Sequence, residues 1–427
     1  MTFSTWFALF VFIATVFAIA VGRMHRSVAT LLGAVTLMVF HILPAEKAVT
    51  FIDFNTIGLL MGMMIIVGVL SRTGVFQYIA VRTVKLTRGN IPAAFVAIML
   101  VTAFLSAVLD NVTTVLLISP IVISLVELVD VNPIPFLIGE AFASNIGGTA
   151  TLVGDPPNII IGSFAHFSFM DFLLNLAPVA VVIMAVVSVW LVWSFRDTLF
   201  TCCVPKERIA GVDESRLIKD PKLLKRAFAA MGLVLAGFAV HHLVHLPAAV
   251  VALFGAALLL AVIPVDGGEV IQKDVEWSTL VFFATFFMVV GGLKETGLIA
   301  LAAARLTDVL QGHPVLALLS VLWISGLACA FINNVAFTAT FVYVVDEMAV
   351  ALGVNAEPLF WTLALGACLG GNGTYLGAAA NVIVADMAER SGQKISFSAF
   401  MKLGFQVVLI SLAISSVYVV WRYGGAL

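Results

Sequence analysis

Three acidic residues lie inside stretches that are otherwise strongly apolar. Asp110 stands between two apolar runs, Asp155 lies in the sequence Gly154-Asp-Pro-Pro-Asn158, and Glu140 lies within the apolar segment 134–164. A charged side chain at the centre of a bilayer costs about 2.5–3.5 kcal/mol on insertion scales, so such residues mark functional sites by default. Helix capping is the structural alternative for the two aspartates, and a place near the membrane surface is the alternative for Glu140. We predict that all three carry protons or cations.

Amide and hydroxyl side chains cluster around the same interruptions of the apolar sequence. Their oxygens and amides suit ions or small polar solutes, although each of them could instead form hydrogen bonds between helices. We predict that they form the substrate site, and they are Asn111, Asn145, Thr149, Thr151, Asn158, Asn333, Asn334, Asn372, Thr374 and Asn381.

The four cysteines form no CxxC pair and no zinc-type spacing, which predicts neither a disulfide framework nor a metal site. Cys329 and Cys368 lie close to the polar clusters and are candidate ligands for a soft metalloid, since thiolates bind such atoms. The alternative, which we favour, is that they are small buried residues. Cys202 and Cys203 are interpreted as incidental. No GxxxxGK[ST], HExxH or GxSxG motif occurs, so we expect no enzyme activity, no cofactor and no nucleic-acid partner.

The composition places most of the chain in lipid. Of the 427 residues, 62% are hydrophobic and 11% are charged, whereas about 25% are charged in an average soluble domain. Apolar runs long enough to cross a bilayer recur from end to end. The first run, 6–21, has no preceding positive charge and no small-residue cleavage site, which indicates a membrane helix rather than a signal peptide. We therefore predict an all-α polytopic membrane protein.

The chain repeats itself at a constant offset of 223 residues. Asp110-Asn111 aligns with Asn333-Asn334, and the run 145–158 aligns without a gap with the run 368–381, including both glycine pairs and the closing asparagine. Such a match indicates an internal duplication. The acidic residues at these interruptions occur only in the first copy, because Asp110, Asp155 and Glu140 align with the neutral residues Asn333, Ala378 and Leu363. A purely structural cap would be expected in both copies, whereas a single coupling centre would be expected in one.

Each copy contains about five membrane spans and one pair of apolar limbs joined by a polar dipeptide. The limbs either cross the membrane twice or form a re-entrant hairpin, and both choices add an even number of crossings. Each copy then crosses an odd number of times, so the second copy is inverted relative to the first. We predict a first inverted repeat at 1–195, a cytoplasmic linker at 196–226 and a second inverted repeat at 227–427.

One helix per repeat must be discontinuous. The apolar segment 134–164 would be roughly 46 Å long as a helix, against a hydrocarbon core of about 30 Å. Pro156 and Pro157 lack N–H groups, and Gly147, Gly148 and Gly154 favour unwound backbone. Irregular backbone at membrane depth is tolerated only where it lines a cavity in the protein.

The basic residues set the orientation. With the N-terminus outside, 18 of the 22 lysines and arginines lie in inside segments, and the opposite orientation reverses this count. We therefore expect a multi-pass protein of the bacterial inner membrane with both termini in the periplasm.

The motifs resemble those of the ion transporter superfamily, and most closely its branch of ArsB/NhaD-type permeases. They are Leu109-Asp-Asn-Val-Thr-Thr114, Ser144-Asn-Ile-Gly-Gly-Thr149, Gly154-Asp-Pro-Pro-Asn158 and Gly370-Gly-Asn-Gly-Thr374. The resemblance covers essentially the whole chain. It implies an elevator-like fold, with the dipeptides at 110–111 and 333–334 at two hairpin tips and the segments 144–158 and 368–381 as two unwound stretches.

In length and architecture the chain most resembles the arsenite efflux pumps. This resemblance implies proton-coupled export of arsenite or antimonite, and such pumps can also pair with a soluble ATPase subunit. A sodium/proton antiporter is the main alternative. A sodium-coupled anion symporter and a channel are weaker ones, the symporter because we predict no membrane-embedded arginine or lysine near the breaks. Whether the chain forms a homodimer is left open.

Overall fold

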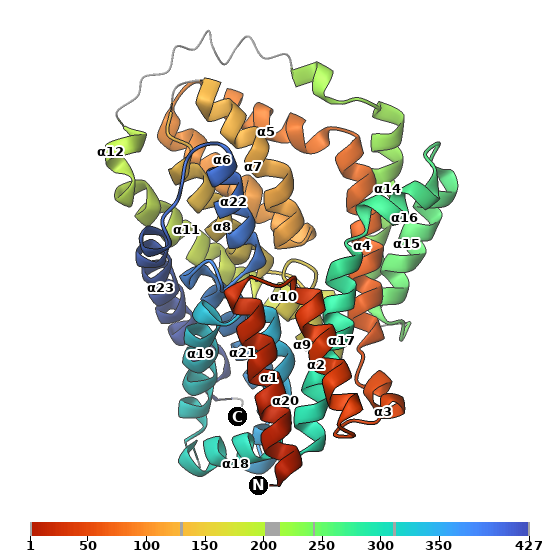
Figure 1. Ribbon diagram of the computed structural model, residues 1–427. Coiled ribbons are helices and arrows are strands. Elements are labelled where there is room, and N and C mark those ends of the chain that lie inside the picture. The colour runs from red at the N-terminus through yellow and green to blue at the C-terminus, as the bar shows by residue number, and fades with distance from the viewer. Residues whose placement is uncertain (1, 129–130, 201–213, 242–243, 311–312, 426–427) are drawn as a thin grey trace.

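The computed structural model describes residues 2–128, 131–200, 214–241, 244–310, 313–425, and every regular element in these ranges is a helix. Nine described helices are long and apolar enough to cross a membrane, or ten if the bent pair of helices at 156–175 forms one span. The predicted all-α polytopic fold is confirmed. Figure 1 shows an elongated bundle in which the helices α5 and α18 lie toward opposite ends.

The helices of the two halves follow the same order. The first half contains α1 Phe3–Val21, α2 Arg26–Val39, α3 Ala45–Thr50, α4 Phe54–Arg72, α5 Val75–Leu86, α6 Ile91–Val108, α7 Asn111–Leu128, α8 Ile134–Gly148, α9 Pro156–Ala165, α10 Phe169–Asn175, α11 Ala177–Ser194 and α12 Arg196–Leu199. The linker ends in the short 3₁₀ helix η1, Glu214–Leu217. The second half contains α14 Pro221–Val240, α15 Ala248–Val262, α16 Gly267–Asp274, α17 Trp277–Glu295, α18 Leu298–Leu310, α19 Pro314–Phe331, α20 Asn334–Leu352, α21 Glu357–Gly370, η2 Gly371–Gly373, α22 Ala379–Arg390 and α23 Phe397–Tyr423.

The helix starts preserve the offset seen in the sequence. The helices α4 to α9 begin 223 residues before α17 to α22, each with its counterpart in order. Local signals explain these starts: Asn90 caps α6 through its side chain, and prolines stand in the first turn of α6, α8, α9, α19 and α21. The duplication therefore has the same helical arrangement in both copies.

The long helices α1, α2 and α4 pack against α14, α15 and α17 and form what we call the scaffold. The packing is exchanged between halves, because α4 lies against α15 and α17 lies against α2. Gly62 of α4 allows this approach, since a Cβ there would lie 2.7 Å from the backbone of Ala252. Such close backbone contact is typical of small residues between membrane helices.

Two helical hairpins and two broken helices form the second unit, which we call the hairpin core. The hairpins are α6–α7 and α19–α20, and Figure 1 shows them entering from opposite ends of the molecule. Each hairpin packs tightly on a broken helix: a Cβ on Gly147 would lie 2.1 Å from the carbonyl oxygen of Ala103, and one on Gly370 would lie 2.3 Å from that of Gly326. These two contacts are equivalent in the repeat, and substitution of either glycine would push hairpin and broken helix apart.

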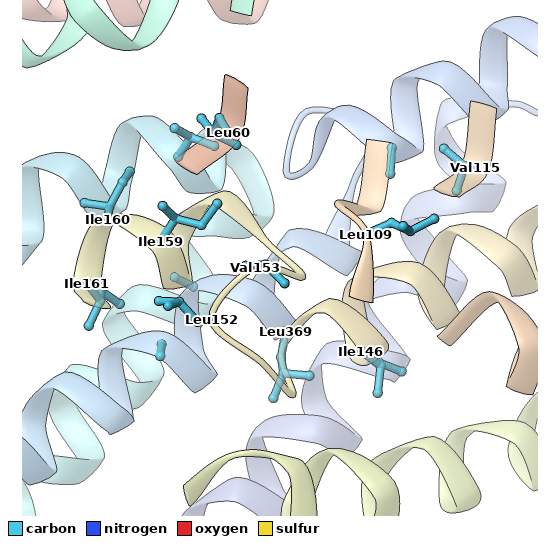
Figure 2. Close-up of a cluster of buried hydrophobic side chains, with 14 of the residues drawn as sticks. Leu60, Leu109, Val115, Ile146, Leu152, Val153, Ile159, Ile160, Ile161 and Leu369 are labelled. Carbon is cyan, nitrogen blue, oxygen red and sulfur yellow. The ribbon is translucent and has the colours of Figure 1, made fainter. Parts of the chain in front are cut away.

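The apolar segment 134–164 and its counterpart in the second half, which contains α21, η2 and α22, are both interrupted at their glycine-rich stretches. The first unwinds between α8 and α9, with Asp155 in extended conformation before Pro156, and the second unwinds between η2 and α22. Figure 2 shows Leu152 and Val153 of the first unwound stretch among buried apolar side chains, with Leu369 of the second half beside them. Irregular backbone at membrane depth is thus enclosed by protein, as its unpaired polar groups require.

Candidate ion-coupling site

The tips of the two hairpins meet at one carboxylate, that of Asp155. Asn111 donates from Nδ2 to Asp155 Oδ1 at 3.2 Å, and Asn334 donates from Nδ2 to the two carboxylate oxygens at 3.4 and 3.5 Å. Asn111 begins α7 in the first half and Asn334 begins α20 in the second. The hairpins enter from opposite ends and their tips stop at the same residue, an arrangement that favours the re-entrant alternative over two full crossings.

The first residue of each tip dipeptide caps the helix that follows. Asp110 Oδ1 accepts from the Thr113 amide at 2.8 Å, and its second oxygen accepts from the Thr113 hydroxyl. Asn333 Oδ1 accepts from the amides of Val335 and Ala336 at 3.1 and 3.4 Å. Capping therefore explains a side-chain oxygen at both positions. It does not explain why the first oxygen belongs to a charged group and the second to a neutral one.

Amides and a thiol link the two halves directly behind the tips. Asn145 donates to the side-chain oxygens of Asn372 and Asn381 at 2.9 and 3.0 Å, and the Cys368 thiol donates to Asn158 at 3.3 Å. Because Asn145 aligns with Cys368 and Asn381 with Asn158, the bonds Asn145–Asn381 and Cys368–Asn158 are equivalent in the repeat. In each half, the residue at this position (Asn145 or Cys368) thus donates a hydrogen bond to an asparagine of the other half.

Most of the remaining predicted polar residues bind backbone carbonyls, either of the unwound stretches or of the helices packed on them. Asn158 donates to the carbonyls of residues 148, 149 and 151, and Asn381 donates to those of residues 371 and 374. The hydroxyls of Thr149, Thr151 and Thr374 also donate to carbonyls. In this conformation these side chains hold the breaks in shape, and a direct role in binding solute stays a prediction for them.

A small central cavity of about 30 Å³ lies between the tips and the scaffold. From the hairpin core it is lined by Asp110, Asn111, Asp155 and Asn334. The side-chain oxygen of Asn111 is buried and accepts no hydrogen bond from any described residue. A buried acceptor without a partner is costly, which makes this oxygen available to a water or an ion in the cavity. The volume suits one or two water-sized occupants.

The scaffold contributes a half-buried arginine to the same cavity, which the sequence analysis did not foresee. Arg26, at the start of α2, lines the central cavity together with Glu276 and Thr279 of the α17 end. Its Nη2 donates to the Thr279 hydroxyl at 2.8 Å, and that hydroxyl donates to Glu276 at 2.8 Å. An arginine therefore lies beside the first break, where we expected no membrane-embedded arginine or lysine. Sequence could not show this, since Arg26 follows the first apolar run like an ordinary charge at the membrane edge.

Two larger cavities lie at equivalent places of the repeat. The α2 cavity, of about 350 Å³, is lined by the loop between α1 and α2, by Asn333 and by α22. The α15 cavity, of about 600 Å³, is lined by the loop before α15, by Asp53 and by α9. Arg26 and Ala379 line both the α2 cavity and the central cavity, whereas the α15 cavity shares no lining residue with the central one. The central cavity in this structure therefore adjoins the α2 side.

Three other sequence candidates lie apart from the lining of the central cavity. Glu140 is fully buried in α8 and accepts a hydrogen bond of 2.5 Å from Ser119, while its other oxygen has no partner among the described residues. Cys329 and Cys368 are fully buried behind the tips, Cys368 within hydrogen-bonding reach of Asn158. Cys202 and Cys203 lie outside the described residues.

Comparison with known proteins agrees with this architecture. The model of the CitMHS family, described as a citrate transporter, matches residues 7–366. A 46 kDa membrane protein of Mycobacterium leprae is 39% identical over 97% of this chain and 98% of its own length. The human P protein is 32% identical over 95% of this chain and 58% of its own length.

The fold also matches a solved membrane transporter. The crystal structure of the YdaH transporter of Alcanivorax borkumensis superposes with a TM-score of 0.60 at 17% identity, covering 89% of this chain and 87% of that one. At this identity the likeness concerns the fold alone. With the family model matched over most of the chain, and with two hairpin tips meeting at a buried carboxylate, this chain belongs to the CitMHS family of membrane transporters.

Proposed function

We propose that the chain is a secondary active transporter that exchanges protons for a small cation, with sodium as the first candidate, and that Asp155 carries the exchanged charge. Alternating access would come from an elevator-like movement of the hairpin core against the scaffold. The observation that carries this proposal is the central cavity. Its walls bear the carboxylates of Asp110, Asp155 and Glu276 against the single guanidinium of Arg26.

Size and ligand chemistry favour a small cation over a larger solute at this point. Sodium needs several oxygens, preferably including an ionised carboxylate. Asp155 supplies a carboxylate between the two tips, and the Asn111 oxygen beside it lacks a partner among the described residues. A proton arriving at Asp155 would neutralise the same carboxylate and so compete with the cation, which is the basis of exchange.

Proton-coupled efflux of arsenite or antimonite is the second candidate, and the two thiols favour it. Cys329 and Cys368 are buried close behind the tips, and thiol sulfur is a good ligand for arsenic. Neither thiol lines the central cavity, so direct ligation would need the tips to separate. Recognition of uncharged As(OH)₃ through hydroxyl groups would need no counter-charge, and the three carboxylates of the cavity then have no evident purpose beyond coupling. A soluble ATPase partner belongs to this candidate alone.

An anion symporter is the third candidate. The family model is described as a citrate transporter, and Arg26 supplies the cation that an anionic solute would need. Arg26 is already linked to the Glu276 carboxylate through the hydroxyl of Thr279, however. The central cavity also has more carboxylates than cations in its lining. The local charge therefore opposes a multiply charged anion unless cations accompany it.

One vesicle experiment separates the three candidates. Everted membrane vesicles containing the protein are energised by respiration, and a pH-sensitive dye reports proton movement on addition of sodium, arsenite or citrate. Uptake of labelled arsenite and citrate is measured in parallel, with choline replacing sodium. Vesicles carrying the Asp155→Asn variant serve as the matched control.

Sodium/proton exchange predicts a saturable dye response to sodium that is lost in Asp155→Asn, with no response to arsenite. Arsenite uptake that needs a pH gradient and does not depend on sodium would show that the transported solute is arsenite rather than sodium. Sodium-dependent citrate uptake would support the anion symporter. Full activity of Asp155→Asn in all three assays would contradict the assignment of Asp155.

A further inference from the structure

Arg26 is the one cation that lines the central cavity among the described residues, and it belongs to the scaffold rather than to the hairpin core. Its guanidinium carries five N–H donors, of which one has a hydrogen-bond partner among the described residues, the hydroxyl of Thr279. The carbon of the guanidinium also lies 5.6 Å from the ring centroid of Phe282. Both contacts are on α17, so Arg26 is fixed to the half of the scaffold that does not contain it.

The repeat shows that the arginine is an addition to a shared arrangement. Glu276 and Thr279 at the start of α17 align with Asp53 and Thr56 at the start of α4, and in both pairs the threonine hydroxyl donates to the carboxylate. Arg26, however, aligns with Ala249, whose backbone amide donates to Asn55. The carboxylate–threonine pair is thus common to both halves, and the arginine occurs on one side only.

The arginine faces the part of the hairpin core that also departs from the repeat. Asp110 and Asp155, which align with neutral residues, line the cavity opposite Arg26. When neither carboxylate holds a proton or a cation, the hairpin core is negatively charged next to a fixed positive charge. Opposite charges attract strongly in a site with little water, and the attraction disappears once the carboxylates are neutralised.

We propose that Arg26 is a positioning residue that holds the unloaded hairpin core on the α2 side of the scaffold, and that loading Asp110 and Asp155 releases the core for movement. An exchanger must prevent its empty form from moving, and this electrostatic attraction across the central cavity supplies that restriction. The inference rests on the proposed function for the identity of the load. The restriction itself depends only on the charge of Arg26 and of the two aspartates.

A cross-linking assay measures how long the core stays on the α2 side without relying on transport. Cysteines are introduced by Met24→Cys, in the scaffold loop, and Val382→Cys, in α22, because both side chains line the α2 cavity. Both are exposed, at 41% and 49%, whereas the native Cys329 and Cys368 are fully buried and so protected from reagent. Cys202 and Cys203 are replaced by serine in the background. A short bifunctional thiol reagent is added to the purified full-length protein in sodium-free alkaline buffer.

In this buffer the initial cross-linking rate of the Arg26→Gln variant should fall about threefold or more below that of the background protein, since its empty core leaves the α2 side more often. Arg26→Lys should stay near the background rate because the charge is kept. His25→Gln, which alters the neighbouring residue lining the α2 cavity, should have no effect. An unchanged rate in Arg26→Gln, or an equal fall in Arg26→Lys, would overturn the proposal.

Two further arms keep the test decisive. If Arg26→Gln does not fold, Asp110→Asn in the presence of native Arg26 removes part of the opposing charge and should slow cross-linking in the same direction; an unchanged rate there would overturn the proposal. Added sodium tests the proposed function separately. It should slow cross-linking of the background protein but not of Arg26→Gln, and a background rate indifferent to sodium would remove sodium as the load while leaving the comparison of Arg26 variants valid.

Discussion

The two hairpin tips form the same kinds of hydrogen bond but differ in charge. Asp110 and Asn333 each cap the helix that follows, and Asn111 and Asn334 each donate to Asp155. The unwound stretches behind them are held by equivalent hydrogen bonds from Asn158 and Asn381. The carboxylates of Asp110 and Asp155 nevertheless have no counterpart in the second half. Architecture thus requires a side-chain oxygen at the tip, as Asn333 supplies, and none at position 155, where Ala378 aligns. The charge of the two aspartates must serve another purpose.

The largest effect is expected from Asp155→Asn, which removes the carboxylate that both tips contact. Exchange activity in vesicles should fall to the level of empty membranes, because neither a proton nor a cation then has a charged site to occupy. The protein should still fold, since the aligned residue in the second half is the neutral Ala378. Size-exclusion profiles in detergent check the folding. A variant that transports at the wild-type rate would show that the charge asymmetry between the halves is unrelated to coupling.

The next effect concerns the tip itself, which Asp110→Asn converts to the sequence of the second tip. Asparagine caps helices about as well as aspartate, so the thermal midpoint should stay close to that of the wild type. Coupled transport should nevertheless be lost or fall severely, because one of the three carboxylates of the central cavity disappears.

The control for this prediction is Asp110→Ala, which removes the cap as well as the charge. It should lower the stability by about 1 kcal/mol relative to Asp110→Asn. If Asp110→Asn transports normally while Asp110→Ala does not, Asp110 is a cap and nothing more.

A moderate effect on stability should distinguish the two glycine turns that join the scaffold helices α4 and α17 to α5 and α18. Gly74 before α5 and Gly297 before α18 have positive φ values of 81° and 75°, so alanine at either position is strained by about 1 kcal/mol. At Gly74 the new Cβ would also lie 1.9 Å from the carbonyl oxygen of Leu217 at the end of the linker, whereas around Gly297 there is open space. Gly74→Ala should therefore lower the thermal midpoint more than Gly297→Ala does. Equal shifts of the thermal midpoint would show that the contact with Leu217 does not constrain the turn at Gly74.

The smallest effect is expected at the thiol that aligns with Asn145. Cys368→Ser keeps a donor for Asn158, so expression and sodium/proton exchange should stay near wild-type values. Resistance of cells to arsenite is measured alongside. Loss of arsenite resistance at normal expression would instead indicate a thiolate ligand and favour the metalloid as the solute.

Sequence predicted the fold well because its main signals are local or repeated. The breaks follow from glycine and proline at 147–157, and the hairpin tips follow from the polar dipeptides between apolar limbs. Whether the limbs cross the membrane could not be decided, since both arrangements have the same hydropathy. Only tertiary structure, through the meeting of Asn111 and Asn334 at Asp155, favours the re-entrant arrangement.

The sequence predicted which residues gather at the site, but not which of them line the cavity and which bind backbone carbonyls. Ten amide and hydroxyl residues were proposed as ligands, yet residue type alone does not tell a donor that faces a cavity from one that faces a neighbouring carbonyl. Thr151 and Thr374 bind carbonyls of the hairpins, while Asn111 and Asn334 line the central cavity. Arg26 was missed because its neighbours Glu276 and Thr279 are some 250 residues away in sequence, and only tertiary packing brings them together.

The reciprocal bonds from Asn145 to Asn381 and from Cys368 to Asn158 have a consequence for the history of the chain. Two identical subunits related by a twofold axis would be obliged to carry the same residue at both positions, and any carboxylate would appear in duplicate. Once both copies are joined in one polypeptide, each position can mutate alone. Covalent fusion is therefore what permits an asparagine at position 145 to have a cysteine as its equivalent at position 368, and a solitary Asp155 to stand where a symmetric ancestor would have had to bury a pair of like charges.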